Sequence, residues 1–290
     1  MSVGAVLVLA LTACSTFSAS TDPPADGGTD GSTPQGDAPD TSDAGDAGGP
    51  VLDADAGTSA YAAAVLADGP LAYWRMGAKT GFSIANEVGG SNALLLQGSV
   101  GLGAAGALSG DDDTAVRFDG LTKGYAVAVD ARPFDFPSGV PFTIEWWAKH
   151  EPVDGGSQFQ HMISAAEGAT PVTGNGYFVY WSGDTQVQVE FAAPTHDITL
   201  TAPTPSGWKY YALVFDGTNV SLVIDGTVED SRLPTGTLAA RQSSFVVGAT
   251  SGSTPGAIGG YGFAGLIDEV AVYDKALSLS RINAHHQAAK

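Results

Sequence analysis

The chain has 290 residues, with 12 Lys or Arg against 31 Asp or Glu, and a formal net charge of −19 at pH 7. This acidic balance, without a cluster of basic residues, argues against binding to nucleic acid or to anionic lipid headgroups. Nine of the acidic residues and none of the basic ones lie in residues 1–57. The rest, roughly 230 residues, is long enough to bury a sizeable core.

An apolar run occupies residues 3–11. It is too short to span a bilayer as a helix, and it fits the apolar region of a secretory signal. Residues 11–14 read Leu-Thr-Ala-Cys and resemble the bacterial lipobox, in which the Cys is lipidated; Cys14 is the chain's single cysteine. The resemblance implies a signal peptide over residues 1–13 and a lipid anchor on Cys14, at the cell surface or in the outer membrane. An ordinary cleaved signal and a chance cysteine are the alternatives, since no Lys or Arg precedes Cys14.

Residues 14–57 are rich in Asp, Gly and Pro and contain almost no large apolar side chain. Such a segment buries too little apolar surface to offset the entropy lost on ordering, so we expect a disordered, extended linker. Its Asp-Gly repeats also raise the possibility of calcium loops. However, an EF-hand loop ends in a Glu, and this segment has none. A tether is therefore the favoured interpretation, followed by a domain over residues 58–290 that opens with a short helix near residues 59–68.

Short apolar runs alternate with Gly, Asp, Asn, Ser and Pro clusters through the rest of the chain. The predicted strands are residues 71–76, 93–97, 115–118, 125–129, 142–149, 162–165, 177–181, 186–191, 198–201, 208–215, 220–224, 244–247 and 266–273. Many short strands with no long amphipathic helix between them predict an all-β sandwich or barrel rather than a parallel α/β sheet. Asp225-Gly226, between strand runs, predicts a hairpin.

Seven motifs within these runs form an ordered set. They are Leu-Ala-Tyr-Trp-Arg-Met at 71–76, Gly-Ala-Leu at 106–108, Ala-Val-Arg-Phe-Asp-Gly at 115–120, Phe-Thr-Ile-Glu-Trp-Trp at 142–147, Trp-Lys-Tyr-Tyr-Ala-Leu-Val-Phe-Asp-Gly at 208–217, Leu-Val-Ile-Asp-Gly at 222–226 and Phe-Ala-Gly-Leu-Ile-Asp-Glu-Val at 263–270. The set resembles the concanavalin A-like LamG jelly-roll family common on bacterial surface proteins. The resemblance implies a two-sheet antiparallel sandwich whose last strand pairs near its first. It leaves the function open, because this fold occurs in lectins, adhesins and hydrolases.

The last predicted strand, residues 266–273, is apolar except for Asp268 and Glu269. A buried carboxylate needs a partner, because burying an unpaired charge is costly. Strand alternation predicts that the two carboxylates lie on opposite faces. Asp268 could accept hydrogen bonds from turn amides, or it could pair with Arg75 or Arg117.

The family resemblance also implies a structural calcium ion. Its ligands would be Asp268, an oxygen from the turn at Asn86-Glu87 and the carbonyl of Gly120, a mixed oxygen set that suits calcium. The chain departs from the family in having Ala78 where relatives often carry a Glu after the first strand. The metal and the simpler hydrogen-bonding role of Asp268 are both left open by the sequence.

Glycoside hydrolysis by a retaining mechanism needs two carboxylates about 5 Å apart. Hydrolases of this fold carry them as Glu-x-Asp-x-x-Glu on one strand, and this chain has no such motif. Glu145 is the best single strand carboxylate, but Thr143 and Trp147 stand where a second acid would lie. Glu190 also has no acid two residues away. We therefore predict no catalytic residue and a non-enzymatic protein, with a divergent hydrolase as the less favoured alternative.

A glycan-binding surface would need aromatic rings that stack on sugars, with polar groups beside them. Trp147, Trp181, Tyr180 and Tyr261 are the candidates, because each adjoins polar or Gly-rich sequence; the alternative is that these rings belong to the core. The pair His285-His286 near the C-terminus is predicted to pack rather than to bind metal.

The predicted function is non-catalytic recognition of a glycan or extracellular protein by a lipid-anchored surface module. The alternative from another class is a structural or adhesive surface protein without a small ligand.

Overall fold

The computed structural model describes residues 59–290 apart from segments at 122–123, 138, 167–175, 184–185, 192–197, 204–205, 235–237, 239–242 and 252–257. The predicted signal peptide, the lipid anchor at Cys14 and the linker lie outside the described residues.

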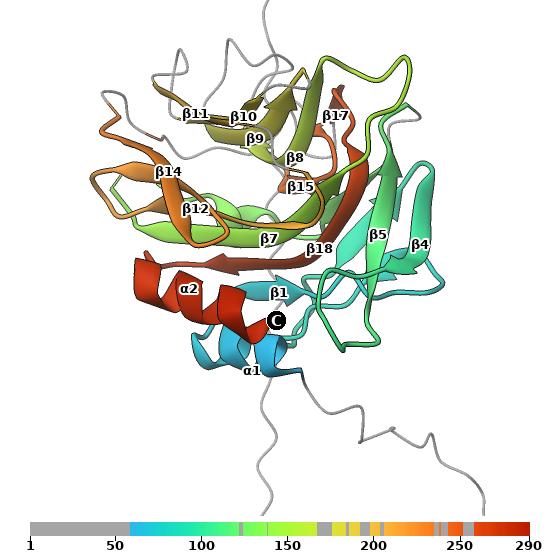
Figure 1. The fold of residues 1–290 in the computed structure, drawn as a ribbon, viewed down its shortest axis with the longest axis horizontal. Helices are drawn as coiled ribbons and strands as arrows, with labels where there is room; N and C mark the ends of the chain where they lie inside the picture. The colour runs from blue at the N-terminus through green and yellow to red at the C-terminus, as the bar shows by residue number, and fades with distance from the viewer. Residues whose placement is uncertain are drawn as a thin grey trace, which may run out of the picture. The chain divides into compact units, whose positions relative to one another are not determined.

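Two antiparallel sheets pack face to face as a sandwich (Figure 1). Sheet A has the strand order β14-β13-β12-β7-β18-β5-β4, and β1 also pairs with β18. Its strands are β1 (Ala72–Trp74), β4 (Val100–Ala105), β5 (Thr114–Asp119), β7 (Phe142–His150), β12 (Lys209–Phe215), β13 (Val220–Ile224), β14 (Thr227–Arg232) and β18 (Ala264–Tyr273). The last strand thus pairs with the first, as the family resemblance implies.

Sheet B has the strand order β11-β10-β9-β8-β15-β6-β3-β2. Its strands are β2 (Ser83–Ile84), β3 (Leu94–Gln97), β6 (Tyr125–Ala128), β8 (Phe159–Ala166), β9 (Gly176–Ser182), β10 (Gln186–Phe191), β11 (Ile198–Pro203) and β15 (Val246–Val247). A separate antiparallel pair is formed by β16 (Thr250–Ser251) and β17 (Ile258–Gly260). The predicted jelly-roll sandwich is confirmed.

The main core lies between the two sheets and is rich in aromatic side chains. Trp146 of β7 stacks on Tyr211 of β12 with ring centres 5.4 Å apart, and Phe142 stacks on Phe136 at 4.5 Å. These rings alternate along their strands with residues that face away from the core, which is the period of two expected for strands. The outward residues of β7 and β12 are buried too, because a second layer covers sheet A.

That second layer consists of two helices (Figure 1). Helix α1 (Ala60–Ala67) begins after Ser59, whose hydroxyl accepts a hydrogen bond from Ala62 N, and helix α2 (Leu279–Ala288) begins after Ser278, which caps Arg281 N. Serine is among the residues preferred at a helix N-cap, so Ser278 marks in the sequence where α2 begins. A single 3₁₀ turn, η1 (Arg132–Phe134), lies between β6 and β7. Neither described α-helix is long and apolar enough to cross a membrane.

The predicted hairpin at Asp225-Gly226 joins β13 to β14, and both residues have positive φ, as this tight turn requires. The prediction omitted the strands β2, β4, β14, β16 and β17. The β4 sequence, Val-Gly-Leu-Gly-Ala-Ala, lacks a strong strand signal, and β14 is a largely exposed, polar edge strand.

The prediction that Asp268 and Glu269 lie on opposite faces of β18 is wrong. The register of β18 against β7 shifts between Asp268 and Ala271, and Glu269 has a φ of 52°. This β-bulge adds a residue to the strand. Because Ile267 and Val270 on either side both face the core, both carboxylates point outward, away from it. The bulge explains how a fully buried strand carries two consecutive acids.

Candidate functional site

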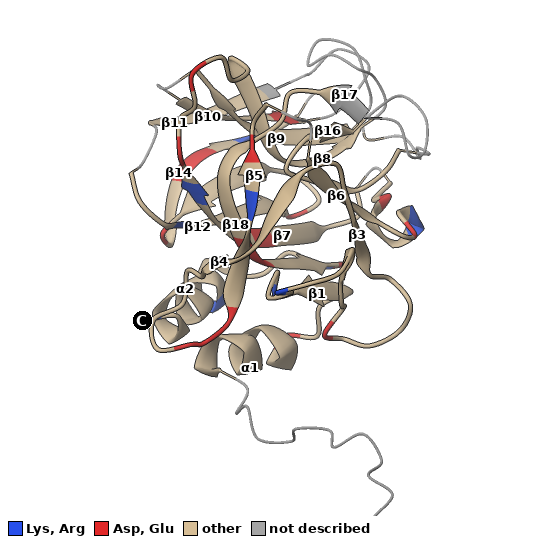
Figure 2. Ribbon diagram, turned by 90° about the vertical axis from the view of Figure 1, so that its right-hand side faces the viewer, with Lys and Arg blue, Asp and Glu red and all other residues tan. Residues whose placement is uncertain are grey.

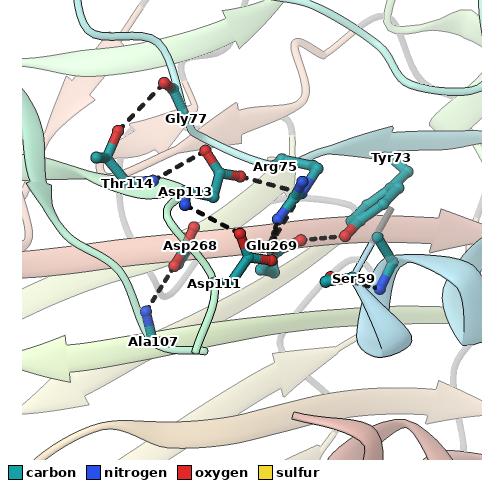
Figure 3. Close-up of polar contacts among 11 residues, drawn as sticks. Ser59, Tyr73, Arg75, Gly77, Ala107, Asp111, Asp113, Thr114, Asp268 and Glu269 are labelled. Carbon is teal, nitrogen blue, oxygen red and sulfur yellow. Dashed lines mark hydrogen bonds and ion pairs between the residues drawn. The ribbon is translucent and has the colours of Figure 1, made fainter. Parts of the chain in front are cut away.

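Arg75 lies at the centre of an acidic cluster beside β18, which we name the Arg75 centre (Figure 3). Its guanidinium contacts Asp111 Oδ2 at 2.5 Å, Asp113 Oδ2 at 3.0 Å and Glu269 Oε1 at 3.2 Å. Tyr73 Oη donates a hydrogen bond to the other oxygen of Glu269. One positive side chain thus connects the loop before β5 to the bulge of β18.

Asp268 stands at the edge of this centre. Its Oδ2 accepts a hydrogen bond of 2.8 Å from Ala107 N, which is the turn-amide role that the sequence left open. Its Oδ1 is buried and has no hydrogen-bond partner among the described residues. Burial and the neighbouring charge of Glu269 raise the pKa of Asp268 well above its ordinary value.

The three predicted calcium ligands do not converge. Asn86 Oδ1 already accepts hydrogen bonds from Tyr73 N at 3.0 Å and Val88 N at 3.2 Å. Gly120 directly follows the residue that pairs with Ala264, four residues before Asp268 along β18, which is roughly 13 Å of strand. In the part of the chain that the structure describes, no three His, Cys, Asp or Glu side chains form a group that could hold a metal ion. Asp268, Asn86 and Gly120 therefore do not fit a calcium ion together.

A second buried polar network lies between sheet A and the helices, and we name it the Glu145 hub. The carboxylate of Glu145 accepts hydrogen bonds from Tyr273 Oη at 2.8 Å and from Tyr210 Oη, and lies 3.0 Å from His285 Nδ1. His285 Nε2 lies 3.0 Å from Asp68 Oδ2 in an ion-pair contact. Glu145 is completely buried, so its carboxylate is a structural partner of α2 and cannot meet a polysaccharide in this structure.

The outward face of sheet B presents a third cluster, the His161 cluster. The ring of His161 on β8 stacks on Tyr180 of β9 at 4.8 Å and on Tyr261 at 5.7 Å, with interplanar angles of 10° and 17°. Phe159 meets both tyrosines edge-on. Tyr180 Oη donates a 2.5 Å hydrogen bond to Glu190 Oε1 on β10. Neither described α-helix covers this face, since both lie against sheet A (Figure 1).

The electrostatics of this cluster are set by burial. Burial lowers the pKa of His161 to about 3, so the ring is neutral at physiological pH. Neither ring nitrogen has a hydrogen-bond partner among the described residues. Burial also raises the pKa of Glu190 to about 7, against the opposing effect of the hydrogen bond from Tyr180. A neutral imidazole and a carboxyl group that titrates near neutrality thus lie beside stacked aromatic rings.

The four predicted ligand-binding aromatics separate into three environments. Tyr180 and Tyr261 come together on either side of His161. Trp181, one residue beyond Tyr180, faces the opposite way and stacks on His150 at 4.0 Å. Trp147 is buried beneath the helices against Tyr61 and His286.

Trp147 and Trp181 therefore pack inside the protein and present no exposed face to a sugar. His285 and His286 pack as expected: His285 is wholly buried and His286 nearly so.

Sequence reasoning missed His161 and the acidic partners of Arg75. The run Asp111-Asp112-Asp113 was a visible signal, because three consecutive acids in a Gly- and Ser-rich turn are unusual beside a strand. His161 had no comparable signal. Its role depends on the contact with Tyr261, 100 residues later in the chain.

The comparisons with known proteins agree with this architecture. Residues 121–283 match the family described as the concanavalin A-like lectin/glucanases superfamily. The chain belongs to this superfamily. No curated protein matches this superfamily member at a significant level.

Solved structures similar to this concanavalin A-like domain include binding domains of botulinum neurotoxins. One is the binding domain of botulinum neurotoxin DC in complex with rat synaptotagmin II, with a TM-score of 0.57 and 10% identity over 77% of this chain and 52% of that chain. The same toxin domain in complex with SialylT gives the same values. A third, titled for the dependence of botulinum neurotoxin type C entry on two ganglioside molecules, has a TM-score of 0.56 and 10% identity over 77% and 52%. The chain spans about half the length of these structures, and at this identity the likeness shows the fold alone.

We expect the stability of this concanavalin A-like domain to fall as the pH rises from about 6 to 8. Burial opposes the charge of His285, but the hydrogen bond and charge of Glu145, with Asp68, outweigh it and raise its pKa. The stability from a raised His pKa is fully present below the unfolded value of about 6.5 and is lost as pH rises through the folded value. Glu190 acts in the same direction, because its folded pKa of about 7 exceeds the ordinary 4.5.

Urea denaturation across this pH range measures the effect. The variants His285→Gln and Glu190→Gln should each flatten the curve, since each removes one of the groups whose folded pKa is raised. Part of the slope should remain in each variant, because burial also raises the pKa of Glu269 to about 8. A free energy of unfolding that stays level or increases between pH 6 and 8 in the unsubstituted chain would contradict the prediction.

Proposed function

We propose that this domain is a non-catalytic recognition module at the cell surface, anchored by a lipid on Cys14, and that it binds glycans through the His161 cluster. The observation that carries the proposal is the partly exposed ring of Tyr261, which stacks on the buried imidazole of His161 beside Tyr180. Sugars suit this chemistry, since they combine apolar faces with hydroxyl groups that donate and accept hydrogen bonds.

The backbone of Tyr261 supports the same proposal. Tyr261 is not a glycine, yet its φ is 35°. Such conformations cost about 1–3 kcal/mol and cluster at ligand-binding sites. Its ring is only partly buried, in contrast to that of Tyr180, so it is the member of the cluster that a ligand can meet directly. The glycan- and protein-bound neurotoxin domains named above have the same fold, which makes a protein ligand the alternative outcome of the test.

The test is a glycan array probed with the full chain and with Tyr261→Ala. We expect the substitution to weaken binding at least about tenfold, the equivalent of about 1.4 kcal/mol, because it removes a stacking ring. Phe82→Ala is the matched control, because Phe82 is an aromatic residue 85% exposed and outside the cluster. Equal binding by Tyr261→Ala and the unsubstituted chain, or an equal loss in Phe82→Ala, would rule out this site. A folded chain that binds no glycan and no protein would favour the structural, adhesive role.

The hydrolase alternative finds its best carboxylate at Glu190, because Glu145 is enclosed in its hub. Retaining hydrolysis would need a second carboxylate about 5 Å away. The described neighbours of Glu190 across the sheet are Phe178 and Thr199, and Gln188 precedes it on the same face. None of these three described strand neighbours is an acid. Release of reducing sugar from polysaccharides by the unsubstituted chain, lost in Glu190→Gln, would overturn the non-catalytic proposal.

A further inference from the structure

The Arg75 centre gathers four carboxyl groups around a single guanidinium, and burial raises the pKa values of Asp113, Glu269 and Asp268. Asp111, Asp113 and Glu269 each contact the guanidinium, and Asp268 adds a fourth carboxylate behind them. The side chain of Glu269 is fully buried, and those of Asp111 and Asp113 are mostly buried. Carboxylates that share a buried site repel one another unless a cation lies between them.

Arg75 supplies that cation in a form that fits the geometry. A guanidinium is planar, always charged and carries five donors, so it can bind several carboxylates at once. Here Nη2 contacts Asp111 and Glu269, while Nε contacts Asp113. The three carboxylates come from two chain segments more than 150 residues apart, and the guanidinium joins them (Figure 3).

Two further features show that the site is built closely around this side chain. Gly77 lies against Asp113, and a Cβ at that position would fall 1.7 Å from Asp113 Oδ1. Tyr73 holds the second oxygen of Glu269 and so fixes the carboxylate toward Arg75. Lys79 is the other positive side chain whose charge acts on this centre, through Asp113.

We propose that Arg75 takes the place of a structural metal ion in this domain, so that its stability does not depend on calcium. The inference follows from the geometry of the Arg75 centre and from the failure of Asp268, Asn86 and Gly120 to converge. It also predicts that the carboxylates attract a divalent cation once the guanidinium is removed, because carboxylate oxygens are preferred calcium ligands.

The experiment measures the melting temperature of the full chain and of Arg75→Gln, each with EDTA, with about 1 mM calcium and with about 1 mM magnesium. We expect EDTA and calcium to change the melting temperature of the unsubstituted chain by no more than about 1 °C. A stability change of about 1 kcal/mol would shift the melting temperature of a domain of this size by more than that. Arg75→Gln should melt about 10 °C lower, because breaking a buried ion pair leaves uncompensated charge. Calcium should then raise its melting temperature more than magnesium does.

Three results would overturn the proposal. The first is a fall in the melting temperature of the unsubstituted chain on EDTA that calcium, but not magnesium, restores. The second is an Arg75→Gln variant that melts like the unsubstituted chain. The third is an Arg75→Gln variant that is destabilised but insensitive to calcium. Should Arg75→Gln fail to fold, Arg75→Lys replaces it, because lysine keeps the positive charge but lacks the planar fork of the guanidinium. A melting temperature of Arg75→Lys that is partly lowered, together with no calcium response in the unsubstituted chain, upholds the proposal.

Discussion

Replacing Glu145 with Ala should reduce the free energy of unfolding by about 3–5 kcal/mol, the cost of removing one partner from a buried ion pair. Glu145 is completely buried, and its carboxylate contacts three side chains from three different elements. Its loss leaves the hydroxyls of Tyr210 and Tyr273 and the ring of His285 without their shared acceptor. For a domain of this size, thermal unfolding should show a decrease of about 10 °C or more in the melting temperature.

Glu229→Ala is the control for this experiment. Glu229 is also a strand glutamate of sheet A, but it is exposed on the edge strand β14, so its substitution should change stability by no more than about 0.5 kcal/mol. The double variant Glu145→Ala/His285→Ala should be less destabilised than the sum of the two single variants, because the two residues contact each other. Equal melting temperatures for Glu145→Ala and Glu229→Ala would show that the hub does not hold the helices to the sheet.

The Glu145 hub and the helices above it restrict which face of the sandwich can bind a ligand. Figure 2 shows only isolated Lys and Arg positions among the acidic ones on the described ribbon, with no continuous basic face. The outer face of sheet A is covered by α1 and α2, and two of its strand carboxylates, Glu145 and Glu269, are engaged with His285 and Arg75. The outward face of sheet B, by contrast, presents stacked rings and a carboxyl group that titrates near neutrality. The asymmetry between the two faces is the physical reason for assigning recognition to sheet B.

The fold could be predicted because its strands, turns and helix starts are each marked by a short stretch of sequence. Alternating apolar and polar residues mark strands such as β7, the Asp225-Gly226 pair marks a tight turn, and Ser278 marks the start of α2. Each of these depends on neighbours within a few residues, so the sequence displays it directly. The ordered set of motifs then selects one sandwich topology among those compatible with many short strands.

The candidate sites were predicted less completely, because they depend on contacts between distant segments. The bulge at Glu269 reverses the alternation of β18, and nothing in the apolar run marks the extra residue. His285 meets Glu145 across 140 residues of chain, and a His-His pair alone indicates neither partner. Tyr180 and Tyr261 were singled out for their polar surroundings, but the ring that joins them belongs to His161, which sequence reasoning left without a role.

Replacing Gly265 with Ala should destabilise the domain strongly. Its φ is 151°, and a Cβ there would lie 2.2 Å from the backbone carbonyl oxygen of Lys149 on the neighbouring strand β7. The obstacle is backbone within the central strands of sheet A, so it cannot rotate away as a side chain can. Strain of about 1–3 kcal/mol from φ and a similar cost for overpacking give an expected loss of about 4 kcal/mol for Gly265→Ala.

The variant Gly81→Ala separates the cost of backbone strain from the cost of overpacking. Gly81 also has a positive φ, of 97°, but no atom lies within 4 Å of the position of its Cβ. Its substitution should therefore cost only the backbone strain, about 1–2 kcal/mol. Urea denaturation of both variants gives the difference, which measures how closely β18 approaches β7. If Gly265→Ala lost no more stability than Gly81→Ala, the closing strand would have room to shift. The bulge that directs Asp268 and Glu269 toward Arg75 would then not be held in place by this contact.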